Sequence, residues 1–194
     1  MHIADVSFFV KPNTALDRDA RKRATSVYLV QRAVPMLPPT LSEQLCSLRA
    51  GEERLAFSVI FTMTEDGRVL KKWFGKTVIK SCGQLAYKHA QNVIDGKSLG
   101  DAPVIPDCAP QDIEHDIRLL ANLARQMRAH RFEEGCLSLS STRLHFDLGE
   151  DGMPIDCAPY DATEANHLVE EVSSILYVLL SRELTFLCTV HVAR

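Results

Sequence analysis

Pairs of acidic side chains are the first residues in this sequence that could do chemistry, because clustered carboxylates can hold the metal ions of a hydrolytic site. Examples are Asp17 with Asp19, Glu52 with Glu53, and Glu150 with Asp151. Their predicted settings are a helix start, a loop and a hairpin turn, where acidic residues are common for structural reasons. We therefore expect these pairs to be structural, and we predict no catalytic residue and no metal ligand in this chain.

Clusters of basic side chains could contact phosphate groups, and such contacts give an affinity that falls as salt is added. The candidates, on one predicted helix and one predicted strand, are Arg21, Arg23, Lys72 and Lys76. The alternative is a solvated helix face and the outward side of a strand pair, which is the usual setting of charge runs. Trp73 lies among the lysines and could stack on a base, but the alternation of its strand favours a packing role.

The overall composition is that of a soluble globular protein. Of the 194 residues 46% are hydrophobic and 24% are charged, and the net charge of −3 gives no argument for nucleic-acid binding. The six cysteines form no C-x-x-C pair, which predicts reduced thiols in an intracellular protein rather than a zinc site or a disulfide framework. The chain does not open with a signal-peptide pattern, and its apolar run at residues 175–180 is far shorter than the roughly 20 residues of a membrane span.

Apolar periodicity and turn residues predict a domain built from both strands and helices. Strands are expected at residues 1–10, 54–64, 68–81, 136–139, 143–148 and 153–157. Helices are expected at residues 16–31, 40–48, 85–94, 110–134 and 164–180. Asp66-Gly67 is a strong hairpin signal, and Thr40 with Glu43 forms a capping box. This order predicts an α+β fold with a mixed sheet and packed helices.

Five segments are similar in sequence to one known family: HIADVSFFV, RATSVYLVQRAVPMLPPTLSEQLCSL, FSVIFTMTEDGRVLKKWFGKTVIKS, LAYKHAQ and EANHLVEE. They resemble the catalytic domain of the ribonuclease II (RNB) family of processive 3′-to-5′ exoribonucleases. The resemblance covers residues 2–171. It is closest to the eukaryotic cytoplasmic branch that works without the exosome, whose fungal relatives include RNA-binding pseudonucleases.

The resemblance implies that the parent protein depends on Mg²⁺. In the family, a run of the form D-x-x-x-x-x-D-x-D-D upstream of HIADVS holds the metal, and an arginine downstream of EANHLVEE steadies the scissile phosphate. This chain begins at Met1-His2, and after Glu171 its sequence no longer resembles that of the family. We therefore expect residues 1–171 to form a partial RNB domain without the aspartate run, residues 172–194 to be a divergent tail, and no Mg²⁺ to be held by this chain alone.

The resemblance also implies contacts with RNA. Tyr28 matches a tyrosine that stacks on the last nucleotide of the RNA channel, and the alternative is a core tyrosine on a helix. Tyr87 and Glu170 match positions that contact the terminal nucleotides, including the sugar, whose 2′-hydroxyl distinguishes RNA from DNA. Their alternatives are a half-buried aromatic and a solvated helix face shared with Glu171. Asp5 matches the aspartate of HIADVS, which could support the metal site indirectly. The alternative, which we favour, is a carboxylate that makes local hydrogen bonds at a strand end.

We expect the chain to be a fragment of an RNA-degrading exoribonuclease that contributes RNA-channel surface and is inactive in isolation. Two alternatives stay open, an RNA-binding pseudonuclease module and a truncated gene product without independent function. The expected partner is single-stranded RNA, with no DNA and no membrane, and the expected location is the cytoplasm. The sequence leaves the oligomeric state open.

Overall fold

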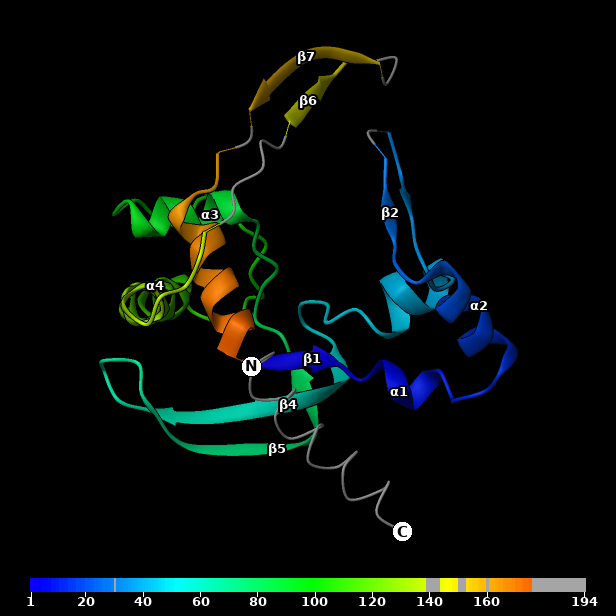
Figure 1. Ribbon diagram of the computed structural model, residues 1–194, viewed down its shortest axis with the longest axis horizontal. Helices are drawn as coiled ribbons and strands as arrows, with labels where there is room; N and C mark the ends of the chain where they lie inside the picture. Colours follow the sequence, from blue (N-terminus) through cyan, green and yellow to red (C-terminus); the bar gives the residue numbers. More distant parts are fainter. Residues whose placement is uncertain (30, 139–143, 150–152, 160, 176–194) are drawn as a thin grey trace. The chain divides into compact units, whose positions relative to one another are not determined.

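The computed structural model describes residues 1–194 except residue 30 and residues 139–143, 150–152, 160 and 176–194. Helices and antiparallel strand pairs alternate along the chain, which confirms the predicted α+β class (Figure 1). The chain divides into two compact units. The first comprises Met1–Ser58, Phe74–Gln84 and Leu139–Asp161, and the second comprises Val59–Trp73, Leu85–Ser138 and Ala162–Arg194.

The main sheet has the strand order β1-β4-β5, so that β4 is its central strand. These strands are β1 (His2–Ala4), β4 (Glu53–Met63) and β5 (Val69–Lys80). β1 runs antiparallel to β4, and His2 lies opposite Ser58. Ala56 and Ser58 of β4 are fully buried, as expected for a strand with neighbours on both sides.

The prediction of one buried strand over residues 1–10 is wrong in two respects: β1 ends at Ala4 with His2 and Ile3 exposed, and the chain then turns into the one-turn helix α1 (Val6–Phe9). Asp5 holds the cap position of this turn. Its carbonyl accepts a hydrogen bond from the Phe8 amide at 3.1 Å, and its carboxylate accepts one from the Ser7 hydroxyl at 2.6 Å. An apolar run of this length does not by itself distinguish a strand from a helical turn.

The helix predicted over residues 16–31 ends much earlier, because α2 covers only Ala15–Arg23. Ala24 then adopts a positive φ of 63°, which no α-helix can continue. Beyond it the chain forms the hairpin of β2 (Val27–Tyr28) and β3 (Ala33–Val34), in which the two β-branched valines lie opposite each other. The prediction of helix after Arg23 is therefore wrong.

The short helix predicted at residues 40–48 is a π-helical turn, η1 (Thr40–Leu45). The predicted capping box is wrong, because Pro39 rather than Thr40 holds the cap position. The carbonyl of Pro38 instead accepts hydrogen bonds from the amides of Leu41 and Ser42 at 2.9 and 3.0 Å. A backbone carbonyl thus takes the first helical amides and leaves the Thr40 side chain without that role.

The predicted hairpin at Asp66-Gly67 is confirmed, since β4 and β5 flank this turn. The amide of Thr64 donates to the carbonyl of Arg68 at 3.0 Å and closes the loop. Gly67 has a φ of +89°, which glycine adopts without steric cost. The turn residues in the sequence therefore predicted where the chain reverses between β4 and β5.

Among the described residues, the second unit contains the helices α3 (Tyr87–Ile94), α4 (Pro110–Glu133) and one over residues 164–175. They lie together in Figure 1, where the last is drawn in orange. Val93, Leu99 and Ile117 form the buried apolar cluster between α3 and α4. The predicted helices at 85–94 and 110–134 are thus confirmed.

The remaining predictions concern residues 136–180. The strand expected at 136–139 is wrong over residues 136–138, because the Cys136 amide bonds to the Arg131 carbonyl at the end of α4. The two later strands are confirmed as the antiparallel pair β6 (Leu144–Leu148) and β7 (Pro154–Pro159). The predicted turn at Asp151-Gly152 and residues 176–194 of the predicted helix and tail lie outside the described residues.

Candidate nucleic-acid interface

Tyr28 lies on the β2–β3 hairpin, and 82% of its surface is exposed. The hairpin is short: beyond its two paired positions, the Leu29 amide donates to the Arg32 carbonyl at 2.9 Å. The alternative of a core tyrosine on a helix is excluded by this exposure and by the strand. An aromatic ring held in solvent on a narrow hairpin can accept a nucleobase on its face.

The two arginines singled out on α2 carry ion pairs with acidic residues one turn earlier. Arg21 contacts Asp17 at 3.2 Å, and Arg23 contacts Asp19 at 2.9 Å. The pKa of Asp17 lies below its ordinary value because the Asn13 amide and then Arg21 donate hydrogen bonds to the carboxylate. The charge of these arginines is therefore largely compensated within the helix, as the alternative of a solvated helix face expects.

The two lysines of β5 differ in setting. The ammonium of Lys76 lies 2.9 Å from the carboxylate of Asp5, which is 6% exposed. The Ser7 hydroxyl and then Lys76 lower the pKa of Asp5, against the opposing effect of burial. Asp5 thus makes the local hydrogen bonds expected of it and also ties the end of β1 to β5. Lys72 lies on an exposed stretch of the same strand.

Tyr87 opens α3 in the second unit, and it is 50% exposed. His89 caps the N-terminus of this helix. It is buried, and its Nδ1 accepts a hydrogen bond from the Ala86 amide at 3.1 Å. Tyr87 lines a hollow of about 520 Å³ whose other residues are apolar. These residues are Leu85, Ala86, Ala90, Ile117, Leu120, Ala165, Leu168 and Val169.

Glu170 lies on the helix of residues 164–175 and faces two arginines and a histidine. Its Oε1 accepts a hydrogen bond from Nη2 of Arg131 at 3.1 Å, and its Oε2 lies 3.3 Å from Nδ1 of His167 and 3.6 Å from Nη1 of Arg128. Burial alone would raise the pKa of Glu170, but the hydrogen bond with His167 and the two guanidinium charges outweigh it and hold the pKa below its ordinary value. The carboxylate is therefore an ionised acceptor.

Glu171 is buried, with 2% of its surface exposed, so the alternative of a solvated face shared by both glutamates is wrong. Nε of Arg131 donates to its Oε2 at 3.1 Å, and Nη2 of the same guanidinium bonds to Oε1. Nη1 of Arg128 lies 3.4 Å from Oε1. Neither arginine was singled out in the sequence, although their spacing places them one helical turn apart on α4.

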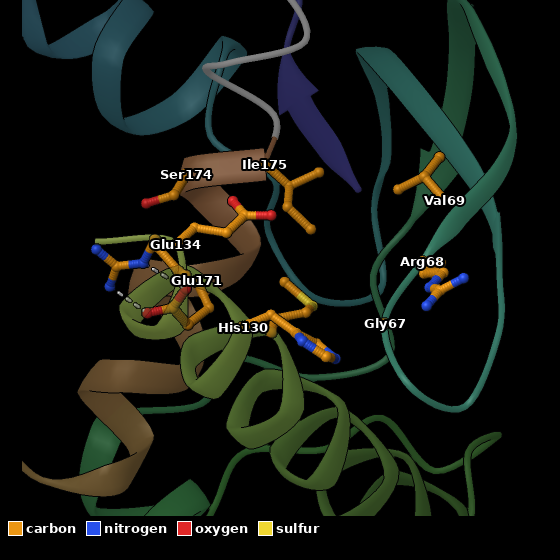
Figure 2. Close-up of a pocket in the computed structure, with 10 residues that line it drawn as sticks. Gly67, Arg68, Val69, His130, Glu134, Glu171, Ser174 and Ile175 are labelled. Atoms are coloured by element: carbon orange, nitrogen blue, oxygen red, sulfur yellow. Dashed lines mark hydrogen bonds and ion pairs between the residues drawn. The ribbon is translucent and has the colours of Figure 1, made fainter. Parts of the chain in front are cut away.

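A pocket of about 470 Å³ lies beside this ion-pair group in the second unit. Figure 2 shows its two sides, with Gly67, Arg68 and Val69 of the hairpin facing Glu171 and Ile175. The dashed lines at Glu171 mark its bonds with Arg131. The lining of the pocket contains positively charged, negatively charged and apolar side chains. It therefore does not form a purely positive site that would bind an anion.

The side chains that could hold a metal ion lie apart in the described residues. Within that part of the chain, no group of three or more histidine, cysteine, aspartate or glutamate side chains could hold a metal ion. The described residues therefore do not fit a Mg²⁺ centre. Among the same residues, no helix is both long and apolar enough to cross a membrane.

The amino-acid sequence of this chain is similar to a known domain family and to several known proteins. The sequence model of the family described as "RNB domain" matches residues 1–177. The chain is 53% identical over 175 residues to DIS3-like exonuclease 2 of Schizosaccharomyces pombe, covering 88% of this chain and 19% of that protein. It is 42% identical over 179 residues to "Inactive exonuclease DIS3L2" of Arabidopsis thaliana, covering 88% and 17%. The chain thus spans about a fifth of the length of these relatives.

Solved structures share the fold at lower identity. RNase R of Mycoplasma genitalium, in complex with ribose-methylated single-stranded RNA, matches with a TM-score of 0.79 and 24% identity over 94% of this chain and 28% of that chain. Yeast Ssd1, described as a pseudonuclease, matches with a TM-score of 0.55 and 24% identity over 68% of this chain and 14% of that chain. These likenesses show the fold.

Proposed function

Because the chain belongs to the RNB domain family, we propose that it forms RNA-contacting surface in the catalytic domain of a 3′-to-5′ exoribonuclease. Its partner in this proposal is single-stranded RNA in the cytoplasm, and DNA is not expected to bind well. Support comes from the relatives, which include an exonuclease at 53% identity.

The observation that carries the proposal is the exposure of Tyr28, 82% of whose surface lies open on a hairpin. Exposing an aromatic ring to this extent gives no packing energy, whereas stacking on a base contributes about 1–3 kcal/mol. Stacking grips any base, because every base has a π-face. In this proposal Tyr28 holds the last nucleotide without choosing its sequence.

Tyr87 and Glu170 contact the terminal nucleotides in this proposal. The ring of Tyr87 borders an apolar hollow, which suits the face of a base. The ionised carboxylate of Glu170 suits the 2′-hydroxyl of the sugar, which can donate a hydrogen bond to it. Binding by these two residues would therefore favour RNA over DNA.

The four basic residues contribute less in this proposal. Arg21, Arg23 and Lys76 already face carboxylates, so a phosphate must compete with Asp17, Asp19 or Asp5. Lys72 completes the set of possible phosphate contacts. We expect these residues to give a salt-dependent share of the affinity, and a small one.

The chain is proposed to bind RNA without cutting it. Its sequence contains no run of the form D-x-x-x-x-x-D-x-D-D, and its described carboxylates do not form a metal-binding group. Mg²⁺ is accordingly assigned to the parent protein rather than to these residues. We further propose that residues 172–194 are a tail distinct from the domain of residues 1–171.

A second candidate is that the parent protein is a pseudonuclease that grips RNA without degrading it. Two similar proteins favour it, the inactive exonuclease of Arabidopsis thaliana and the yeast pseudonuclease Ssd1. The aspartate run of the parent discriminates the two, because it would be intact in a nuclease and replaced in a pseudonuclease. A chain that bound no RNA at all would support the third alternative, a truncated product without independent function.

The proposal is tested by the affinity of the chain for a fluorescent single-stranded RNA, measured by fluorescence anisotropy. Tyr28→Ala is expected to weaken binding about tenfold, which corresponds to the loss of one stacked base. Tyr28→Phe keeps the ring and is expected to bind like the unaltered chain. Leu137→Ala is the matched control, because Leu137 is another large side chain that is 86% exposed. Equal affinities of the Tyr28→Ala and Leu137→Ala variants would overturn the role of Tyr28.

A further inference from the structure

The ion-pair group between α4 and the helix of residues 164–175 is asymmetric. Glu171 is buried, whereas half of the Glu170 side chain is exposed. One guanidinium, that of Arg131, reaches both carboxylates through Nη2. The group therefore joins a solvent-exposed carboxylate to a buried one through a single side chain.

The guanidinium of Arg131 is fixed on three sides. Nε and Nη2 form a forked pair with Glu171, and Nη1 donates to Sγ of Cys136 at 2.9 Å. The Cζ atom of the guanidinium also lies 5.4 Å from the centre of the Phe132 ring, a distance at which a cation–π interaction is attractive. These contacts leave the Nη2 group with one defined direction toward Glu170.

The two carboxylate oxygens of Glu170 differ in how closely their partners approach them. Oε1 accepts the 3.1 Å bond from Arg131, whereas Oε2 has the longer contacts with His167 at 3.3 Å and with Arg128 at 3.6 Å. A carboxylate oxygen carries two lone pairs. Oε2 therefore keeps capacity for a further hydrogen bond from a donor in solvent.

We propose that Arg131 is a positioning residue for Glu170: buried Glu171 fixes the guanidinium, which holds Oε1 of Glu170 and leaves Oε2 to accept a hydrogen bond from a ribose 2′-hydroxyl. This inference rests on the proposed contact between Glu170 and the sugar. It assigns the discrimination of RNA from DNA to three residues acting in series. Arg131 touches no nucleotide in this arrangement, and it acts through the orientation and charge of Glu170.

The same pair of helices supplies a matched control. Arg125 on α4 forms an ion pair with Glu164 on the second helix, and both side chains are 52% exposed. Arg125→Ala therefore removes an ion pair between the same two helices and leaves the group at Glu170 intact. An effect that arises only from loosened helix packing would occur in this variant as well.

The test compares the affinity of the full chain for an oligouridylate and for an oligodeoxyuridylate of the same length, by fluorescence anisotropy. These two probes differ only in the 2′-hydroxyl. The unaltered chain is expected to bind the RNA probe about tenfold more tightly, as one hydrogen bond to a charged acceptor gives. Glu170→Gln is expected to bring the ratio of the two affinities close to one.

The inference is tested by two variants that leave Glu170 in place. Arg131→Lys keeps the charge but loses the fork, and Glu171→Gln keeps the shape but loses the charge. Both are expected to lower the RNA-to-DNA ratio severalfold, while Arg125→Ala keeps it at the value of the unaltered chain. Circular dichroism checks that each variant is folded, and one folded variant of the two suffices.

The possible failures are distinguishable. A ratio near one for the unaltered chain would sink the proposed contact of Glu170 with the sugar. A ratio that falls in Glu170→Gln but persists in Arg131→Lys and Glu171→Gln would refute the positioning role alone. A ratio that falls equally in Arg125→Ala would show that helix packing, rather than the Arg131 fork, controls the site, and would also overturn the inference. If Arg131→Lys and Glu171→Gln both fail to fold, Arg131→Gln removes the same guanidinium, and an unchanged ratio there would overturn the inference.

Discussion

Two ion pairs between α4 and the helix of residues 164–175 should differ sharply in their contribution to stability. Glu171 is 3% exposed in its side chain, whereas Glu164 is 52% exposed. We therefore expect Glu171→Gln to destabilise the chain far more than Glu164→Gln does, although each change removes one negative charge from the same helix. Burial, rather than the number of ion pairs, decides the difference.

The expected magnitudes follow from the surroundings of each carboxylate. Breaking a fully buried ion pair costs about 3–5 kcal/mol. The arginines facing Glu171 are 31% exposed and keep Glu170 as a partner, so water and the second carboxylate offset part of that loss. We expect a loss of about 2–3 kcal/mol for Glu171→Gln. The exposed pair at Glu164 contributes less than about 1 kcal/mol.

Urea unfolding followed by fluorescence measures both losses. The chain has one tryptophan, Trp73, which belongs to the same compact unit as Glu171 and Glu164, so its emission reports on the relevant part of the molecule. The two variants should differ in the midpoint of unfolding and share one denaturant slope. Losses that agree within about 0.5 kcal/mol would refute the reasoning from burial.

Two further predictions concern the hairpin turn and the acid stability. Gly67→Ala should lower the melting temperature more than Gly96→Ala. Both glycines have a positive φ, +89° and +81°, so alanine is strained at either position. The new Cβ at Gly67 would also lie 2.8 Å from a side-chain carbon of α4, whereas the new Cβ at Gly96 would meet open space. Equal shifts would contradict this. The pKa of Asp5 is lowered by Ser7 and then by Lys76, so its contribution is present above the ordinary aspartate pKa of about 4 and is lost as pH falls through the lowered value. Asp5→Asn should therefore flatten the fall of stability below about pH 4, measured by urea unfolding across pH; an unchanged acid limb would contradict the assignment.

Local signals in the sequence predicted those elements whose structure depends on nearby residues. The Asp66-Gly67 turn and the amphipathic pattern of α4 each specify an element without reference to the rest of the chain. The hairpin at Val27–Tyr28 was missed because pairing with residues farther along overrides a helical pattern. The capping box at Thr40 failed for a similar reason, since a neighbouring proline carbonyl took its role.

The candidate site was predicted only in part. The resemblance to a family pointed to Tyr28, Tyr87 and Glu170, but only the structure shows that Tyr28 is exposed and that Glu170 is ion-paired. Arg131 was not predicted from the sequence, because its role depends on which helix packs against α4. The spacing of residues along α4 gives the face they share, and it does not give the partner of that face.

The central claim is that this chain binds single-stranded RNA and does not cut it. The most direct test incubates the purified chain with a 5′-labelled single-stranded RNA and Mg²⁺, and resolves the products on native and denaturing gels. A retarded band is expected on the native gel, and an RNA of unchanged length is expected on the denaturing gel. A ladder of shortened, Mg²⁺-dependent products, or the absence of any retarded complex, would contradict it.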